Sequence, residues 1–176
     1  MDRYLTHFEV QMLGPIFKNT LNYGSIVCSQ NDANIGGVNN SITPAGRAYF
    51  SSVFNCADFS YASPDRQWLF VHEMMHVWQW GHGIYPVIAA LGIAVQTAGQ
   101  YAQKGYAYDL TAGKNLIDFN IEQQASIVAD YWALKSAKMA AQHNVNKNPA
   151  LVDYGPLITQ LQKSGPSTRK LDQMQL

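Results

Sequence analysis

The sequence predicts a single α+β domain that is mostly helical and carries a small antiparallel sheet. Its 176 residues suit one domain with a sizeable core, and 47% of them are apolar, an ordinary share for a globular protein. The chain contains no internal repeat and no interdomain linker, and only two short runs have strand character. We expect the domain to span residues 1–163 and residues 164–176 to form a flexible tail.

The first half of the chain begins with a helix-like segment, followed by two short strand candidates. Apolar residues in the first twenty positions recur with a loosely helical spacing, which Gly14 and Pro15 interrupt. Residues 25–29 (SIVCS) and 47–54 (RAYFSSVF) are the strand candidates, because they are rich in β-branched or aromatic side chains. Residues 30–45 between them are rich in Asn, Asp, Gly and Ser, which predicts an extended surface loop.

A clear helix start follows at Ser63. Ser63 is a good N-cap, Pro64 suits the first helical position, and Asp65 complements the positive end of the helix dipole. The helix can continue through QWLFVHEMMHVWQW and end near Gly81 or Gly83.

Three more helical segments are predicted in the second half. Residues 86–103 contain the most apolar stretch of the chain and predict a buried helix. Residues 121–142 are rich in alanine and free of Gly and Pro, so they predict another. A short helical piece is expected over residues 157–162, after a turn.

The charge balance excludes one large class of function. Twelve Lys and Arg residues balance twelve Asp and Glu residues, and charged residues make up only 14% of the chain. Without a basic excess, nucleic-acid binding is not expected.

The N-terminus has an acid at position 2 and no uninterrupted apolar segment, so secretion would need a route other than a Sec signal peptide. Residues 86–98 fall short of the ~20 apolar residues that a transmembrane helix needs.

The two cysteines, Cys28 and Cys56, are too few for a disulfide scaffold and form no CxxC pair. A single bridge formed in an oxidising compartment fits the sequence. Two buried free thiols fit it equally well.

Residues 72–76 (HEMMH) form an HExxH motif inside the helix that begins near Ser63. His72 and His76 are four positions apart, so both imidazoles leave the same face of the helix and can bind one ion. Glu73 lies about 100° further round the helix, beside the ion, where it can take a proton from a metal-bound water. Two imidazole nitrogens and a water suit Zn²⁺, which brings the pKa of that water to near neutrality.

A catalytic zinc site needs a third protein ligand, and two residues compete for that role. His82 has the spacing of the third histidine of metzincins, but their pattern needs a glycine where this chain has Gln79. Glu122 is favoured, because a buried glutamate needs a partner and the chain contains only three glutamates. The helix face that follows Glu122 would let a second helix approach closely, since all its residues are small: Ala125, Ser126, Ala129 and Ala133.

Five runs of the sequence resemble a known family: SITPAGRAYF, DFS, LFVHEMMHVWQW, YAYDL and FNIEQQASIVADYW. They are similar to bacterial gluzincin-type zinc peptidases, which occur as C-terminal extensions of type VI secretion spike (VgrG) proteins, near Rhs elements, or as stand-alone effectors. The resemblance spans roughly residues 40–135 and implies a zincin-like domain around the HExxH helix. It also implies that His72, His76 and Glu122 are the zinc ligands and that Glu73 is the catalytic base.

The resemblance further implies an antibacterial toxin that acts in the periplasm of a target bacterium. Its implied partners are a type VI spike or carrier protein and a cognate immunity protein. The thermolysin pattern has an Asp four residues after the third ligand, where this chain has Ser126. Asp118 and Asp130 are therefore the candidates for holding the histidines from behind.

A peptidase must also stabilise the oxyanion of its tetrahedral intermediate, and many zincins add a tyrosine or histidine for this. Tyr106 and Tyr108 are the candidate catalytic pair, with His82 or Tyr101 as alternatives. Arg47 could bind a substrate carbonyl or carboxylate, although a surface ion pair explains it as well.

Together these features predict a zinc metallopeptidase in which Glu73 activates a water that attacks a peptide carbonyl. Two alternatives stay open. One is a degenerate zincin that serves as a binding module. The other is a zinc hydrolase that cuts peptidoglycan cross-links.

Overall fold

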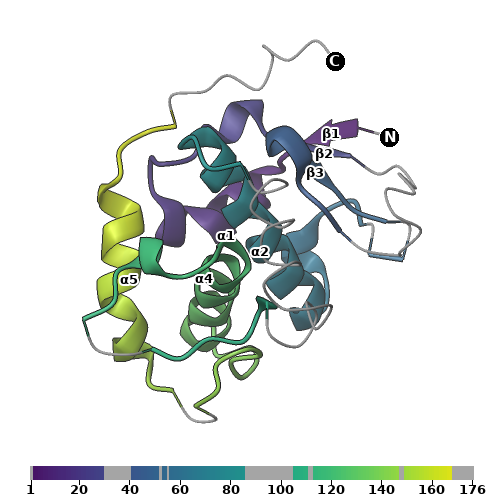
Figure 1. Cartoon of the computed structure of the whole chain (residues 1–176). Coiled ribbons are helices and arrows are strands. Elements are labelled where there is room, and N and C mark those ends of the chain that lie inside the picture. Colours follow the sequence, from purple (N-terminus) through teal and green to yellow (C-terminus); the bar gives the residue numbers. More distant parts are fainter. Residues whose placement is uncertain are drawn as a thin grey trace.

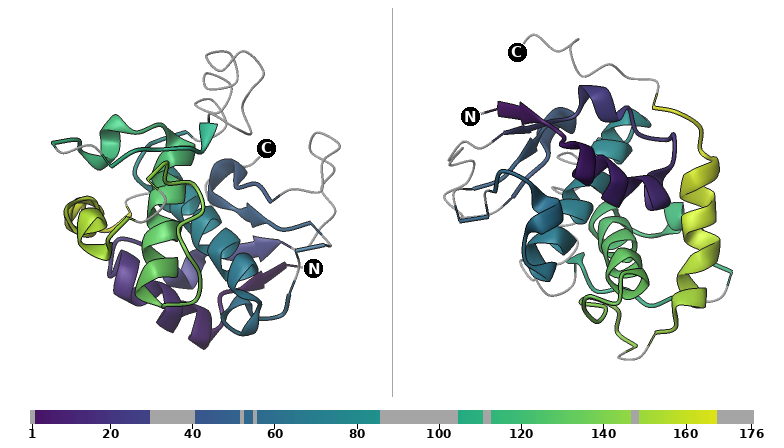
Figure 2. Two further views of the ribbon diagram at one scale, coloured as in Figure 1. Left: turned by 90° about the horizontal axis from the view of Figure 1, so that it is seen from below. Right: turned by 180° about the vertical axis from the view of Figure 1, so that it is seen from behind.

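Two long helices, α2 (Pro64–Gly81) and α4 (Ile121–Lys135), pack against each other at the centre of the molecule (Figure 1). The computed structural model describes residues 2–29, 41–51, 53–54, 56–85, 105–110, 113–146 and 149–167. Within these residues the chain is a small α+β domain with four helices and a three-stranded sheet. The sheet lies on the α2 side of this pair, whereas α5 (Leu151–Lys163) packs on the α4 side (Figure 2).

Helix α2 begins and ends where the sequence predicts. Ser63 is the N-cap with extended backbone angles, Pro64 is the first helical residue, and Asp65 lies in the first turn. The backbone turns away after His82 at Gly83, whose φ of 85° favours glycine. Every residue from Phe70 to Gly81 is buried, so the histidine-bearing part of the helix is surrounded by protein.

Helix α4 begins at the predicted residue but ends at Lys135, earlier than the expected residue 142. The side chain of Asn120 caps its start by accepting a hydrogen bond from the backbone N–H of Gln123. The chain leaves the helix through Ala137, which has a φ of 54°. It then folds back, because the Asp130 carboxylate accepts hydrogen bonds from the backbone N–H groups of residues 142 and 143. Alanine content alone did not predict this long-range competition.

The sheet is mixed, and the expectation of an antiparallel sheet was wrong in part. Strand β2 (Val27–Ser29) pairs antiparallel with β1 (Asp2–Tyr4) but parallel with β3 (Ala48–Tyr49). Parallel pairing needs a connection of a dozen or more residues, and residues 30–47 supply one between β2 and β3. The strand predicted over residues 47–54 is limited to the two residues of β3.

Helix α1 (His7–Phe17) continues through the predicted interruption at Pro15. Pro15 lies in the last turn and is exposed, so its missing N–H costs the helix only one backbone hydrogen bond. On the opposite face, Leu13, Ile16 and Phe17 are at most 1% exposed. Burial of this apolar face outweighs the cost of the proline.

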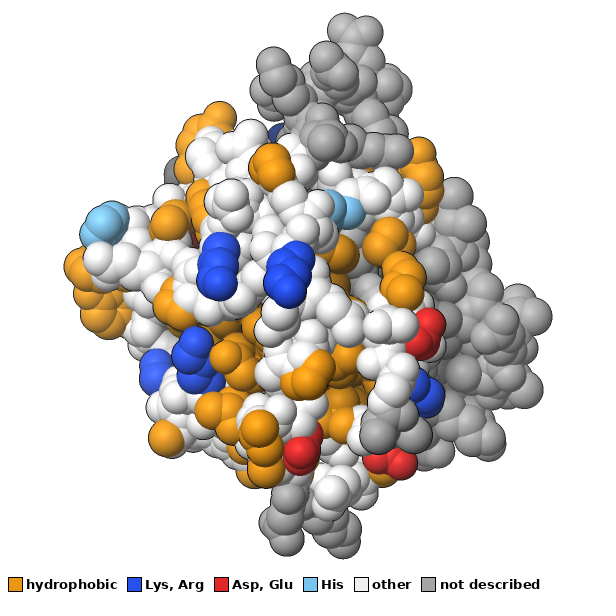
Figure 3. All heavy atoms as spheres, turned by 90° about the vertical axis from the view of Figure 1, so that its left-hand side faces the viewer, with side chains coloured by type: hydrophobic (Ala, Val, Ile, Leu, Met, Phe, Trp, Pro, Cys, Tyr) orange, Lys and Arg blue, Asp and Glu red, His pale blue; other side chains and the backbone are white. Residues whose placement is uncertain are grey.

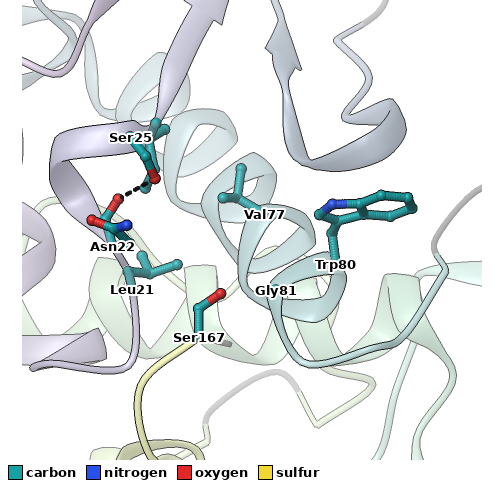
Figure 4. A pocket seen from close by; sticks show the side chains of 8 residues that line it. Leu21, Asn22, Ser25, Val77, Trp80, Gly81 and Ser167 are labelled. Carbon is teal, nitrogen blue, oxygen red and sulfur yellow. Dashed lines mark hydrogen bonds between the residues drawn. The ribbon is translucent and has the colours of Figure 1, made fainter. Parts of the chain in front are cut away.

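The end of the described chain lies against the end of α2. Helix α5 is longer than the predicted piece over residues 157–162, and the segment after it carries Ser167 to Gly81. A Cβ added at Gly81 would lie 2.2 Å from Ser167 Oγ, so only glycine permits this approach. Figure 4 shows both residues lining a small pocket with Val77 and Trp80. The predicted helix over residues 86–103, Tyr101 and the rest of the predicted tail lie outside the described residues.

Several other expectations can be compared with the described residues. Cys28 and Cys56 are both free thiols. Burial raises the pKa of the Cys28 thiol to about 12. No described helix is long and apolar enough to cross a membrane. On the face seen from the α5 side, basic, acidic and hydrophobic side chains are interspersed (Figure 3).

Candidate metal centre

Three buried side chains from the two central helices converge on one point. Helix α2 supplies His72 and His76, one turn apart, and the first turn of α4 supplies Glu122. The two histidine Nε2 atoms lie 3.2 Å apart. Glu122 Oε2 lies 3.1 Å from Nε2 of His72 and 3.3 Å from Nε2 of His76. The three potential ligand atoms therefore form a nearly equilateral triangle.

This triangle fits one face of a tetrahedral zinc site. At Zn–N and Zn–O distances of about 2.0–2.1 Å, the corners of a regular tetrahedron lie about 3.3–3.4 Å apart. The three measured separations, 3.1, 3.2 and 3.3 Å, are close to that edge length. Two imidazole nitrogens and a carboxylate oxygen are also the donor types that zinc takes in catalytic sites with an open fourth position. His72, His76 and Glu122 could therefore hold Zn²⁺.

The buried side chains of Glu122 and His76 each stabilise the charged form of the other. His76 is 6% exposed and Glu122 is 7% exposed. Burial by itself lowers the pKa of His76, but the adjacent Glu122 carboxylate raises that pKa to about 9. Burial likewise opposes ionisation of Glu122, and the facing imidazoles hold its pKa well below the usual range. A metal ion that binds here would displace the extra proton of His76.

Glu73 lies beside the triangle, and Thr43 holds it. Glu73 is 3% exposed, and burial raises the pKa of its carboxyl group above the usual value for glutamate. Thr43 Oγ1 donates a hydrogen bond of 2.6 Å to Glu73 Oε2. Thr43 precedes a turn in which Ala45 and Gly46 have φ of 52° and 77°, and this turn packs on α2. Sequence reasoning missed Thr43, although it lies in the SITPAGRAYF run.

Two aromatic rings lie close to the ring of His72. The His72 ring stacks on Trp68 at a centroid distance of 5.2 Å, and the ring of Tyr106 lies 5.8 Å away. The ring of Tyr106 also lies 5.4 Å from that of His143. Of the predicted tyrosine pair, Tyr106 is therefore the one whose ring lies beside a candidate metal ligand, His72.

The hydroxyl of Tyr108 belongs to a second buried network. Its hydroxyl donates a 2.7 Å hydrogen bond to Asp130 Oδ2 and lies 2.9 Å from the hydroxyl of Tyr154. Burial and the nearby Asp130 carboxylate raise the pKa of Tyr108 well above its usual range. Trp68 Nε1 donates to the other oxygen of Asp130 at 2.7 Å. This network thus buttresses Trp68, on which His72 stacks.

The remaining candidates are engaged elsewhere. His82 caps the end of α2, with its Nδ1 2.7 Å from the Trp78 carbonyl and its ring stacked on Trp78. Arg47 forms an ion pair with Asp2. The carboxylate of Asp118 accepts a hydrogen bond from the backbone N–H of Asn115, at the start of a turn.

His76 is held from behind by an amide, and not by an aspartate as the sequence suggested. Its Nδ1 lies 2.7 Å from Oε1 of Gln79, one turn further along α2. Asp130 serves Trp68 and Tyr108 instead. In the sequence, Gln79 was noted only because it stands where the metzincin pattern needs a glycine.

Comparison with known proteins places this arrangement in context. No family model matches the chain. Over 137 residues it is 36% identical to the type VI secretion system spike protein VgrG2b of Pseudomonas aeruginosa. That match covers 76% of this chain but only 13% of the spike protein. The solved structure of the effector domain of Pseudomonas aeruginosa VgrG2b superposes with a TM-score of 0.67 at 36% identity. The superposition covers 79% of this chain and 78% of the solved one.

Proposed function

Since the chain belongs to the family of the VgrG2b effector domain, we propose that it is a type VI secretion effector with zinc metallopeptidase activity. The observation that carries the proposal is the triangle of His72 Nε2, His76 Nε2 and Glu122 Oε2, with edges of 3.1–3.3 Å. Glu73, a buried carboxylate that is not part of the triangle, lies next to it. This combination supports the proposal, because zinc peptidases with an HExxH motif use its two histidines as ligands and its glutamate as the general base.

The bound ion would supply Lewis-acid chemistry, polarising the scissile carbonyl and lowering the pKa of a water. His72 and His76 would be the neutral ligands, and Glu122 would contribute the negative charge. Its place in the first turn of α4 helps to keep Glu122 ionised, because the positive end of the helix dipole favours a carboxylate there.

Glu73 is the general base. Thr43 occupies its Oε2, so Oε1 is the oxygen that takes the proton from the attacking water. The same carboxyl then delivers the proton to the nitrogen of the departing amine. Burial raises the pKa of Glu73, which makes this carboxylate a stronger base than an exposed glutamate.

Tyr106 is the residue of the predicted pair that we assign to the oxyanion. Its ring lies beside His72, whereas the hydroxyl of Tyr108 is committed to Asp130 and Tyr154. A phenol that donates to the developing negative charge lowers the barrier only if it reaches the reacting carbonyl.

Family membership also supports proposals about delivery. The relative is a type VI spike protein, so we propose that a spike or carrier protein of that system delivers this chain without a Sec signal. A peptidase of this kind would act in the periplasm of a target bacterium, and the producing cell would need a cognate immunity protein.

The test uses the purified chain with Zn²⁺ and a pool of denatured proteins as substrate. Glu73→Gln should retain zinc and lose cleavage, because it removes the base but no ligand. His76→Ala should lose both zinc and cleavage. Cleavage by Glu73→Gln at the wild-type rate would contradict the mechanism. If the chain cleaved purified peptidoglycan but not the protein pool, cross-link hydrolysis would replace peptidase activity as the proposed function.

A further inference from the structure

Gln79 is a fully buried amide whose two ends contact different parts of the candidate metal centre. Its Oε1 lies 2.7 Å from Nδ1 of His76. Its Nε2 lies 2.9 Å from the backbone carbonyl of Ile121 and 3.0 Å from Oε1 of Gln124. The side chain therefore spans the gap between α2 and the start of α4.

These contacts fix the direction of every hydrogen bond in the link. The Ile121 carbonyl can only accept, so the NH₂ group of Gln79 must face it. The oxygen of Gln79 then faces His76 and can only accept, so Nδ1 of His76 must carry a proton. The lone pair of the neutral imidazole is consequently on Nε2, the atom that lies 3.2 Å from His72 Nε2 and 3.3 Å from Glu122 Oε2.

The link continues into α4 with the same polarity. Nε2 of Gln124 donates to the carbonyl of Phe119 at 2.8 Å, which leaves Oε1 of Gln124 to accept from Gln79. The two backbone carbonyls at which the link ends, those of Phe119 and Ile121, lie just before Glu122 in the chain. The hydrogen bonds that set the tautomer of His76 thus also set how close the start of α4 lies to α2.

We propose that Gln79 is a positioning residue that holds His76 in its Nδ1-protonated tautomer and holds the start of α4 at the distance where Glu122 can share a metal ion with His76. This inference rests on the zinc centre of the proposed function. It does not extend to His72, whose Nδ1 has no hydrogen-bond partner among the described residues.

Zinc affinity, measured by competition with a chromogenic chelator on the full chain, tests the proposal. Gln79→Met removes the acceptor and the donors while keeping the length of the side chain. Gln67→Met is the matched control, because Gln67 is also a buried glutamine of α2 with two hydrogen bonds. Those bonds run to the Ser60 carbonyl and to Nζ of Lys138. Gln79→Glu retains an acceptor for His76 but loses the donors to α4.

We expect Gln79→Met to weaken zinc binding roughly 10- to 100-fold, whereas Gln67→Met should stay within about threefold of wild type. Gln79→Glu should fall between them. In the ¹⁵N-labelled, zinc-loaded wild type, the His76 ring should carry its proton on Nδ1. A Gln79→Met variant that binds zinc as tightly as Gln67→Met, or a wild type that binds zinc through His76 Nδ1, would overturn the inference.

The outcome for Gln79 is separable from the fate of the proposed activity. A wild type that binds zinc but cleaves no peptide, with affinity lost in Gln79→Met, would support the positioning role and contradict the peptidase. If wild type cleaved peptides and Gln79→Met kept the zinc affinity of wild type, the peptidase would be supported and the positioning role contradicted. A wild type that binds no zinc would overturn both.

Discussion

Replacing Tyr108 with phenylalanine tests whether this tyrosine stabilises the fold or takes part in catalysis. The change removes a single oxygen atom, whose hydrogen is donated to Asp130 at 2.7 Å. Hydrogen bonds to charged groups contribute about 1.5–3 kcal/mol, and Asp130 is fully buried, so water cannot replace the lost donor. The Tyr154 hydroxyl loses less, because Nδ2 of Asn144 still donates to it at 3.1 Å.

We therefore expect Tyr108→Phe to lower the free energy of unfolding by about 2–3 kcal/mol, which for a chain of this size lowers Tm by roughly 4–12 °C. Urea and thermal unfolding measure both quantities. Tyr61→Phe is the control, since Tyr61 is 73% exposed and should change stability by no more than ~0.5 kcal/mol.

The companion variant is Tyr106→Phe, which tests the tyrosine assigned to the oxyanion. It should reduce kcat by about 100-fold or more, because it removes the hydroxyl that would donate to the oxyanion. The reasoning would be refuted by a Tyr108→Phe variant of wild-type stability whose kcat is reduced.

Two further predictions concern regions away from the metal ligands. In native protein at pH 8, iodoacetamide should react with no thiol other than that of Cys56, because Cys28 is 1% exposed and burial raises its pKa to about 12. Denatured protein should react at both thiols. Reaction of Cys28 in the native protein would contradict this prediction. Gly81→Ala should displace Ser167 and speed amide exchange at residues 165 and 167 relative to wild type, since the new Cβ would lie 2.2 Å from Ser167 Oγ. Adding Ser167→Gly should return the exchange rate at residue 165 to its wild-type value, because the nearest remaining atom, the Cα of residue 167, lies 3.9 Å away. Faster exchange than wild type in the double variant would show that the contact is not responsible.

Local sequence signals predicted the central helix well. The bounds of α2 follow from Ser63, Pro64 and the glycines after Trp80, because caps and turns act within a few residues. The spacing of His72 and His76 placed both imidazoles on one face for the same reason. Glu122 was a longer inference, drawn from the small residues that follow it in the helix and from resemblance, and the structure brings it to the histidines.

Local sequence signals did not predict the contacts between segments that are distant in the chain. Helix α4 ends early because Asp130 binds backbone N–H groups twelve and thirteen residues further on, an interaction that helix propensity does not include. Tyr106 and Tyr108 are equivalent in sequence terms, and only the position of Asp130 in space distinguishes them. The role of Gln79 depends likewise on the carbonyl of Ile121, 42 positions away.

The most direct test of the central claim is an anomalous difference map from crystals of the zinc-loaded chain, collected at the zinc edge. We predict one peak within about 2.0–2.2 Å of His72 Nε2, His76 Nε2 and a Glu122 carboxylate oxygen, with Glu73 outside the ligand set. A peak that His82 coordinates in place of Glu122, or zinc bound away from both histidines of the HExxH motif, would contradict the account.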